Sequence, residues 1–247
     1  MLLTLLAATL SAQPKPPAAQ GLPPLTKKVE AASAGAPKPA VDLKPGRYNY
    51  RVKIAMGAKE VSLKSSTSIK EENGAWTATD NVESDMAAAT DTTTLEKGTL
   101  IVRKRSAKQG PMAIDVAFAG GKATGKMTMN GQEHPVDAEL GGTLFADGGG
   151  AFQAISCLPL AAGYSTTYRN FDLQKQKVKV MRLQVAGAEG VTVPAGKFNT
   201  YKVEIASADG GNDQIALWIA KGTRQVVKIS AVMASMGGAT MTSELMP

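Results

Sequence analysis

The sequence predicts a mostly β protein: a single curved antiparallel sheet, either an open half-barrel or a meander, with one short helix and a disordered leader before it. Three observations predict this class. Apolar and polar residues alternate with a period of two in several short runs, turn-forming pairs separate these runs, and no long helical periodicity is present. With 247 residues, 43% of them hydrophobic, the chain has enough material for a globular core.

The cysteine and histidine counts exclude several classes of protein. The chain contains one Cys and one His, so it forms no intramolecular disulfide and lacks the ligands of a tetrahedral structural zinc site. We therefore expect no metal and no cofactor.

The first twelve residues, MLLTLLAATLSA, are predicted to be a signal peptide (1–12). They form an apolar run followed by small residues, much shorter than the roughly 20 residues of a membrane-spanning helix. Gln13 stands where a bacterial lipoprotein would carry its lipid-bearing cysteine, so no lipid anchor is predicted there. No Lys or Arg precedes Lys15, which leaves the true start codon open. We expect an exported protein, periplasmic or secreted.

Residues 13–45 are predicted to be a Pro/Ala/Lys-rich disordered linker. They hold eight of the 13 prolines, and proline removes the N–H that helices and ladders need. They also carry +3 of the net charge of +7, so a weak, salt-sensitive contact of the linker with an anionic surface is an expectation. The antiparallel β domain is predicted to span residues 46–247.

The remaining positive charge does not predict nucleic-acid binding. Lys and Arg are spread singly over residues 46–247, with few aromatic residues between them, apart from the triplet Arg103-Lys104-Arg105. We interpret that triplet as a solvated hairpin end, and we expect no nucleic acid among the partners.

The first strand of the domain is the clearest. Tyr48, Tyr50, Val52 and Ile54 alternate with polar or cationic residues, which places the apolar set on one face of a strand. The same alternation recurs, with less contrast, at residues 61–69, 114–118, 201–205 and 227–233. Several short strands in succession predict an all-β sheet.

Turn residues lie between these runs. Asn73-Gly74, Gly120-Gly121, Asn130-Gly131 and Lys221-Gly222 supply the positive φ that tight hairpins require. Val193-Pro194-Ala195-Gly196 has the pattern of a type I turn. These turns predict adjacent hairpins in a meander.

Residues 144–158 break the strand pattern. Their apolar residues have mixed helical spacing, and Gly148-Gly149-Gly150 interrupts them. A short helix over residues 151–158 is predicted, because Pro159 ends what precedes it. We expect this helix to plug or cover the sheet.

Three motifs follow one another in roughly the last hundred residues. They are Cys157-Leu-Pro-Leu160 with Gly163-Tyr164, the segment VTVPAG at 191–196 leading into Tyr201, and Leu217-Trp218 followed by TRQVVK at 223–228. Together they resemble a family of uncharacterised exported bacterial domains. The resemblance implies a strongly curved antiparallel half-barrel, broadly similar to the lipoprotein-carrier folds of the bacterial envelope. It implies no reaction and no catalytic residues, and residues 46–142 match by strand pattern alone.

The residues available for catalysis are few. His134 lies between two strand-like runs with no second His and no motif that marks a nucleophile, so we interpret it as a loop residue. Cys157 lies in an apolar segment, where a free Cys usually behaves as a small buried hydrophobe; a reactive thiol is the less favoured alternative.

Three acidic motifs give only weak indications of catalysis or metal binding. Asp91-Thr92-Thr93 lacks the glycine and the second copy of the aspartic-protease signature. Asp147-Gly148-Gly149-Gly150 and the segment at 209–213 are interpreted as hairpin loops, since neither has the spaced carboxylates of an EF-hand; calcium at 209–213 is a minor alternative.

Binding is the stronger prediction. A curved sheet with one covered face encloses apolar ligands well, and its candidate ligand-binding residues are Trp76, Tyr168 and Trp218. Tyr48 and Tyr50 are assigned to ordinary core. One of the two tryptophans is expected to face away from that core.

The sequence therefore predicts a non-catalytic exported binding or scaffold protein of the bacterial cell envelope, with a lipid, a lipoprotein or another protein as its partner. It is not predicted to be an enzyme; a hydrolase of unrecognised type is the alternative. An enzyme should show acids and a base converging in a polar pocket, whereas a carrier should show a concave apolar face. The oligomeric state is left open.

Overall fold

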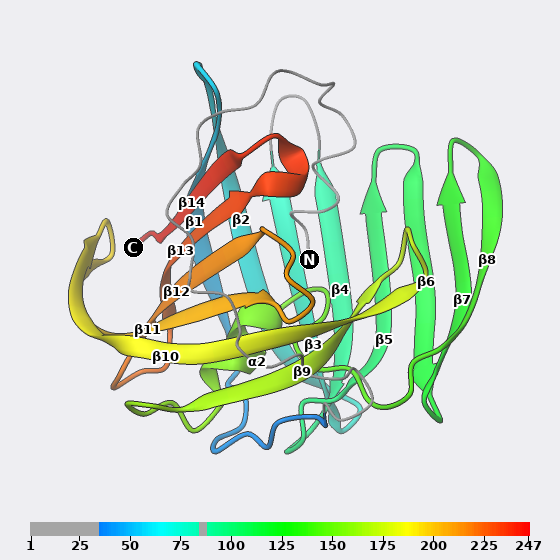
Figure 1. Cartoon of the computed structure of the whole chain (residues 1–247), viewed down its shortest axis with the longest axis horizontal. Helices are drawn as coiled ribbons and strands as arrows, with labels where there is room; N and C mark the ends of the chain where they lie inside the picture. Colours follow the sequence, from blue (N-terminus) through cyan, green and yellow to red (C-terminus); the bar gives the residue numbers. More distant parts are fainter. Residues whose placement is uncertain (1–34, 84–87) are drawn as a thin grey trace.

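A computed structural model describes residues 35–83 and 88–247. The predicted signal peptide (1–12) and residues 13–34 of the predicted linker lie outside the described residues. Fourteen strands form one antiparallel sheet that is not closed into a barrel (Figure 1). The predicted fold class, a mostly β chain with an open curved sheet and a short helix, is confirmed.

The elements follow one another as two series of strands with a helix between them. The first series is β1 (Gly46–Met56), β2 (Lys59–Glu72), β3 (Ala75–Glu83), β4 (Ala89–Glu96), β5 (Val102–Gln109), β6 (Met112–Ala119), β7 (Lys122–Met129) and β8 (Gln132–Glu139). Helix α2 (Ala151–Ser156) follows. The second series is β9 (Ser165–Asp172), β10 (Lys177–Val193), β11 (Gly196–Ser207), β12 (Gln214–Ala220), β13 (Val226–Met233), the 3-10 turn η3 (Ala234–Met236) and β14 (Ala239–Leu245).

The two series are meanders that meet in the middle of the sheet. Consecutive strands pair within each series, and β14 pairs with β1, where Tyr50 lies opposite Leu245. The chain therefore leaves the sheet at one edge, β8, and re-enters it at the other edge, β9. Residues 140–164, which make this passage, are called the crossover segment below.

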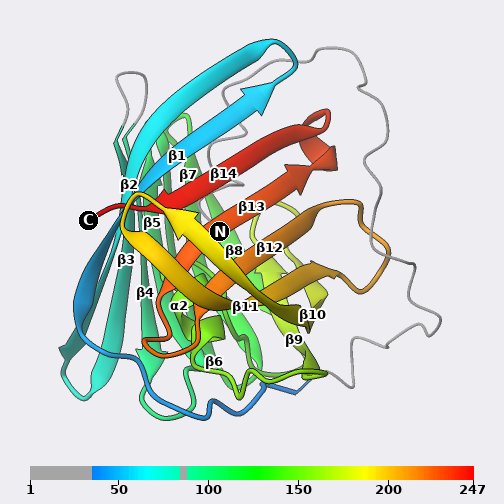
Figure 2. The same cartoon turned by 90° about the vertical axis from the view of Figure 1, so that its left-hand side faces the viewer.

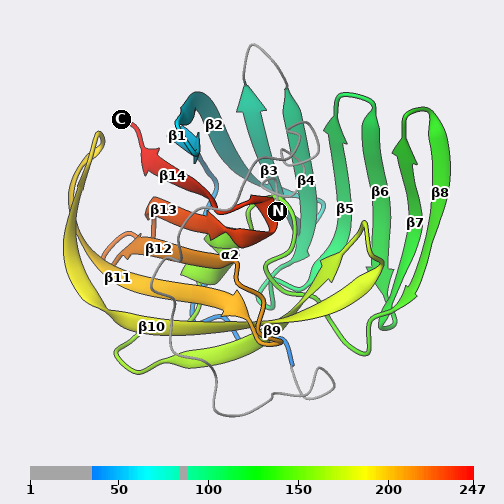
Figure 3. The same cartoon turned by 45° about the horizontal axis from the view of Figure 1, so that its top comes forward.

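The sheet curves until its two ends approach each other (Figure 3). Phe171 of β9 packs edge-on against Phe118 of β6, with ring centroids 6.3 Å apart. The side chain of Gln176 donates to the carbonyl oxygen of Pro135 in β8 at 3.0 Å. Pro135 suits an edge strand, because an edge residue has no ladder partner for a missing N–H.

Three of the four turn pairs have the predicted conformation; at Lys221-Gly222 the prediction is wrong, since the positive φ of that turn lies at Arg224 (63°). Asn73 and Gly74 have φ of 52° and 74°, and Asn130 and Gly131 have φ of 50° and 79°. Positive φ at both central residues is the geometry of a type I′ turn, whose twist matches that of the flanking strands. The predicted hairpins are confirmed, and they set the register of the first meander.

One face of the sheet carries the core. In β1, Tyr50, Val52 and Ile54 are buried, and Arg51 and Lys53 between them are exposed. β6 and β14 show the same alternation. The buried residues of both meanders join one hydrophobic cluster on the concave side. The N-terminal half, which the sequence matched by strand pattern alone, therefore belongs to the same sheet.

The crossover segment lies inside the curve of the sheet, where α2 occupies the concave side (Figure 2). Leu144 and Phe145 are 1% and 0% exposed, and Phe145 forms a backbone bridge with Ile101 of the first meander. The predicted helix that plugs the sheet is confirmed, but it ends at Ser156 rather than at residue 158. In the described part of the chain, no helix has the length and apolar character needed to cross a membrane.

The end of the predicted linker differs from expectation. Residues 35–45 have no regular secondary structure, but they pack on the domain. The N–H groups of Ala40 and Val41 donate to the carbonyl oxygen of Cys157, and Leu43 is 6% exposed. Proline removes the N–H donors that a sheet needs, but it does not prevent a segment without regular structure from packing on the domain. The ordered part of the chain therefore begins before residue 46.

The closest approach of the crossover segment to the sheet is at Gly149. A Cβ on this residue would lie 2.2 Å from the carbonyl oxygen of Asp91 and 2.8 Å from that of Ala78. Backbone atoms cannot move away cheaply from such a contact. Only glycine fits at this position.

We expect Gly149→Ala to lower the free energy of unfolding by about 1–3 kcal/mol through overpacking. Urea unfolding followed by circular dichroism measures this. Gly190→Ala is the matched control, because a Cβ on the exposed Gly190 meets no atom within 4 Å, and it should change stability by less than about 0.5 kcal/mol. Equal stability of the two variants would contradict the close packing.

Candidate functional site

A cavity of about 90 Å³ lies between the concave face of the sheet and α2. Its walls come from β1, β2, β3, β13, β14 and the crossover segment. The apolar residues that line it are Val52, Ile54, Leu63, Val82, Ala151, Phe152, Ile229 and Met241. The polar residues that line it are Tyr50, Ser65, Ser66, Thr67, Asp80, Asn81, Gln153 and Ser243.

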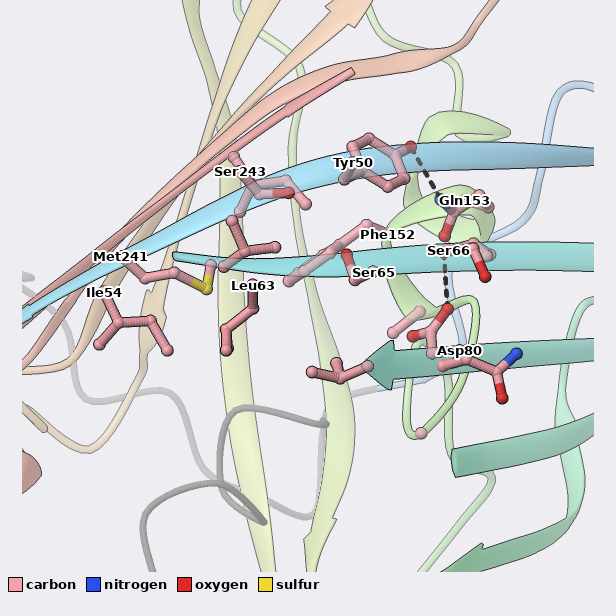
Figure 4. A pocket seen from close by; sticks show the side chains of 17 residues that line it. Tyr50, Ile54, Leu63, Ser65, Ser66, Asp80, Phe152, Gln153, Met241 and Ser243 are labelled. Atoms are coloured by element: carbon pink, nitrogen blue, oxygen red, sulfur yellow. Dashed lines mark hydrogen bonds between the residues drawn. The ribbon is translucent and has the colours of Figure 1, made fainter. Parts of the chain in front are cut away.

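Strand register separates a polar end of this cavity from an apolar end. Thr67 of β2 lies opposite Asp80 of β3. Leu63 lies further along β2 on the same face, because alternate residues of a strand face the same side. Figure 4 shows Ile54, Leu63 and Met241 at the end of the cavity away from Asp80. The cavity therefore runs from a carboxyl group to an apolar floor.

Asp80 is the acidic residue of the polar end. Thr67 Oγ1 donates to Asp80 Oδ1 at 2.6 Å, and the Gly150 N–H donates to the same carboxyl. Burial raises the pKa of Asp80 to about 6; the bond from Thr67 opposes this rise, and the negative charge of Asp91, directly opposite on β4, adds to it. The group is mostly ionised at neutral pH and becomes protonated in mild acid.

Beyond Asp80 lies a buried ionic cluster of Asp91, Arg105 and Asp147. Arg105 Nη2 and Nε donate to Asp91 at 2.7 and 3.1 Å, and Arg105 Nη1 donates to Asp147 Oδ1 at 3.0 Å. Asp147 Oδ2 accepts the N–H of Phe171 at 2.7 Å. The three charged residues are 5% exposed or less. Burial alone would raise the pKa of Asp91, but Arg105 outweighs it and holds that pKa below its usual value.

Two interpretations from the sequence are wrong at this cluster. The Arg103–Arg105 triplet is not a solvated hairpin end: it lies within β5, and Arg105 points inward while Lys104 forms an exposed ion pair with Asp115. A register shift between β4 and β5 changes the phase of alternation just before Arg105. The segment 147–150 is not a surface hairpin loop either, because it is buried against the sheet.

The structure does not bring the three predicted ligand-binding residues together, and none of them lines the cavity. Trp76 is buried on β3 and donates from Nε1 to Asp42 at 2.7 Å. Tyr168 is buried on β9, edge-on to the ring of Phe145, with centroids 5.8 Å apart. Trp218 is half-buried on β12. A ligand-binding role for these residues stays a prediction.

Trp218 faces away from the core, which confirms that one of the two tryptophans does so. It lies in register with Lys202 and Lys228, on the opposite face of β12 from the fully buried Leu217. The two lysine ammonium groups lie 5.9 and 5.5 Å from its ring centroid, and its Nε1 donates to Glu189. The ring and the Nε1 of Trp218 thus have their partners within the protein, in Lys202, Lys228 and Glu189.

Sequence reasoning assigned no lining residue of the cavity to a site, and two of the residues it missed are Tyr50 and Asp80. Tyr50 is core, as predicted, but it also lines the cavity: its hydroxyl donates to the carbonyl oxygen of Val226 at 3.0 Å and accepts from Gln153 Nε2 at 3.4 Å. Asp80 was not considered. A signal for it exists, since it follows Trp76 and Ala78 in the same period-two phase and thus stands as an acid among inward residues.

The other candidate reactive groups lie outside the cavity lining. His134 is exposed and lies within the edge strand β8, paired with Met127 of β7, so its interpretation as a loop residue is wrong. Cys157 is buried and free, and burial raises the pKa of its thiol to about 11, so it is a thiol rather than a thiolate at neutral pH. Across residues 35–83 and 88–247, no group of three or more His, Cys, Asp or Glu side chains is placed to hold a metal ion.

Comparison with protein families identifies one match. A family model described as a protein of unknown function, DUF3108, matches residues 43–244. This range contains all three motifs on which the resemblance was based, so the resemblance to an uncharacterised family is confirmed. No curated protein matches the chain.

Solved structures align over most of the chain at low identity. The hypothetical lipoprotein YmcC from Escherichia coli (K12) has 11% identity and a TM-score of 0.38, covering 81% of this chain and 83% of that chain. A Bacteroides fragilis NCTC 9343 protein, described as a candidate exported protein with a YmcC-like fold, has 12% identity and a TM-score of 0.31, covering 83% and 97%. A DUF1329 family protein from Desulfovibrio piger ATCC 29098 has 9% identity and a TM-score of 0.27, covering 81% and 82%.

Removing the cation of the buried cluster should be strongly destabilising. We expect Arg105→Met to lower the free energy of unfolding by about 3–5 kcal/mol, because two buried carboxylates lose their partner. Lys104→Met, one residue away on the exposed face, should cost less than about 1 kcal/mol. Urea denaturation of both variants tests this, and similar losses in the two would show that the cluster does not hold the fold.

Neutralising Asp80 should stabilise the protein at neutral pH. The folded-state pKa of Asp80 is raised from 3.8 to about 6, so stability present below pH 3.8 is lost as the pH rises through 6 and the carboxyl ionises. Asp80→Asn should therefore gain on the order of 2–3 kcal/mol near pH 7.5, with the gain vanishing near pH 4. Asp115→Asn on the exposed face should show no such gain. Unfolding curves at several pH values measure this, and a destabilised Asp80→Asn at neutral pH would refute it.

Proposed function

Since the chain belongs to the DUF3108 family of proteins of unknown function, we propose a function from its own cavity: it is an exported binding protein that holds the apolar part of a small amphiphilic molecule without chemically changing it. The observation that carries this proposal is the cavity between the sheet and α2, with apolar residues at one end and a polar group at the other. Concave, mostly apolar sites with a few polar groups are typical of small-molecule binding.

The apolar end supplies the affinity in this proposal. Val52, Leu63 and Met241 are each 6–7% exposed and leave space between them and Phe152 of α2. Each methylene group that enters such a space gains about 0.8 kcal/mol from its transfer out of water. An alkyl chain is the simplest ligand that fits this lining.

The size of the cavity limits the ligand. A water molecule needs roughly 10–15 Å³ of such space, so a cavity of about 90 Å³ takes several waters or the end of an alkyl chain. It does not take a whole membrane lipid in this conformation. The proposed ligand is therefore a short amphiphile, or a single chain of a longer molecule.

The arrangement of acids favours binding over hydrolysis. Of the three neighbouring carboxyls, only Asp80 lines the cavity. The oxygens of Asp91 and Asp147 are engaged by Arg105 and by the N–H of Phe171, and both residues are at most 2% exposed. Hydrolysis by an acid and a base needs two carboxyls that both reach the substrate. Here only the Asp80 carboxyl faces the cavity, so such a pair is not formed.

The location belongs to the proposal as well. The apolar run at residues 1–12, followed by the proline- and lysine-rich linker, supports export to the periplasm or outside the cell. The positive charge of that linker supports a weak, salt-sensitive contact with an anionic surface. In this arrangement the domain binds its ligand near the envelope.

Filling the cavity should weaken binding. We expect Val52→Phe to weaken binding of n-hexanol by about tenfold or more, because the larger ring occupies the space between Leu63 and Ser243. Lys53→Phe places the same ring on the exposed face and should bind like the wild type. Isothermal titration calorimetry gives the affinities, and circular dichroism checks that both variants fold.

The natural ligand can be sought directly. Native mass spectrometry of the protein purified gently from the exported fraction should show a co-purifying small-molecule mass that is lost on denaturation and absent from Val52→Phe. If n-hexanol binds neither the wild type nor the Lys53→Phe variant, or binds Val52→Phe equally well, the cavity is not a binding site.

A further inference from the structure

The polar end of the cavity offers hydrogen-bond acceptors, which are the two carboxyl oxygens of Asp80. A carboxylate has about four acceptor positions on its two oxygens. On Asp80, Thr67 Oγ1 and the Gly150 N–H occupy two of them. Asp80 lines the cavity and is only partly buried, so the remaining acceptor capacity is available there.

The hydroxyl of Tyr50 does not supply a free donor for an anion. The hydroxyl of Tyr50 already donates to the carbonyl oxygen of Val226 and accepts from Gln153. Burial raises the pKa of Tyr50, so the hydroxyl stays protonated and keeps this arrangement. Asp80 is the one residue of the described lining that carries a charge at neutral pH.

The charges around Asp80 are predominantly negative. Asp91 faces it from β4, Asp147 belongs to the crossover segment, and Arg105 of β5 supplies the positive charge. Arg105 directs its three guanidinium nitrogens at Asp91 and Asp147. With three carboxylates and one guanidinium, the group has two net negative charges when all are ionised. Among the described residues, no Lys or Arg forms an ion pair with Asp80.

Resting on the proposed function, we propose that the cavity selects an alkyl chain that ends in an ammonium group and rejects a carboxylate on the same chain. An ammonium group placed at Asp80 makes charge-assisted hydrogen bonds with the free acceptor positions. A carboxylate there meets like charge in a partly buried site, where repulsion is weakly screened. Specificity thus has both an attractive and a repulsive element.

The titration of Asp80 supports this selectivity. With a pKa of about 6, the carboxyl is ionised above that pH, where a primary ammonium, with a pKa of about 10, keeps its charge. Of the other charged groups that face Asp80, Asp91 and Arg105 hold each other in their ionised forms, and Asp147 pairs with Arg105 Nη1 at 3.0 Å. The preference for the ammonium headgroup should therefore weaken as the pH falls below about 6.

The experiment compares three probes with the same chain: hexylammonium, n-hexanol and hexanoate. Each is titrated calorimetrically into the exported full-length protein near pH 7.5. We expect hexylammonium to bind at least about tenfold more tightly than hexanoate. Asp80→Asn should reduce this ratio to about twofold or less, whereas Asp115→Asn, which removes the same charge from the exposed face, should keep the wild-type ratio.

The outcomes separate this inference from the function on which it rests. If n-hexanol binds the wild type and Val52→Phe loses it, while hexanoate binds as tightly as hexylammonium, the headgroup selectivity is refuted and the binding function stands. An unchanged ratio in Asp80→Asn also refutes the selectivity, since another group then reads the headgroup. If none of the three probes binds, both the function and the inference are refuted.

Discussion

A guanidinium buried between two carboxylates constrains the interior of this protein more than any other contact. Arg105 of β5 holds Asp91 of β4 and Asp147 of the crossover segment, and Asp147 in turn accepts the N–H of Phe171 in β9. Charges out of water are tolerated only when their hydrogen-bonding capacity is matched. This requirement fixes the crossover segment against the first meander and against the edge strand of the second.

The same constraint shapes the cavity. The three glycines at 148–150 lie so close to the sheet that a Cβ on Gly148 would be 2.3 Å from Thr93 Oγ1. Their close approach brings the N–H groups of Gly149 and Gly150 to Asp91 and Asp80, and leads directly into α2. The polar end of the cavity is thus built against this ionic cluster; burial there, and to a smaller extent the negative charge of Asp91, raises the pKa of Asp80.

Much of the fold could be predicted because its determinants are local. Alternation in β1 and the Asn73-Gly74 pair each encode a backbone geometry within a few residues, and Pro159 marks the end of the α2 region. The candidate site was harder to predict from the sequence. Trp76 is held by Asp42 from the linker end, far away in sequence, and Asp80 gains its environment from Asp91 and from the crossover segment.

By itself, the sequence determined several of the strands, the Asn-Gly hairpins, the short helix and the sided character of the sheet, because alternation and turn conformation are properties of neighbouring residues. Only the tertiary structure decided that β1 pairs with β14, that a register shift turns Arg105 inward, and that the glycine-rich segment lies buried on the sheet. These features join residues distant along the chain, so they depend on packing and on the pairing of buried charges, which local patterns do not encode.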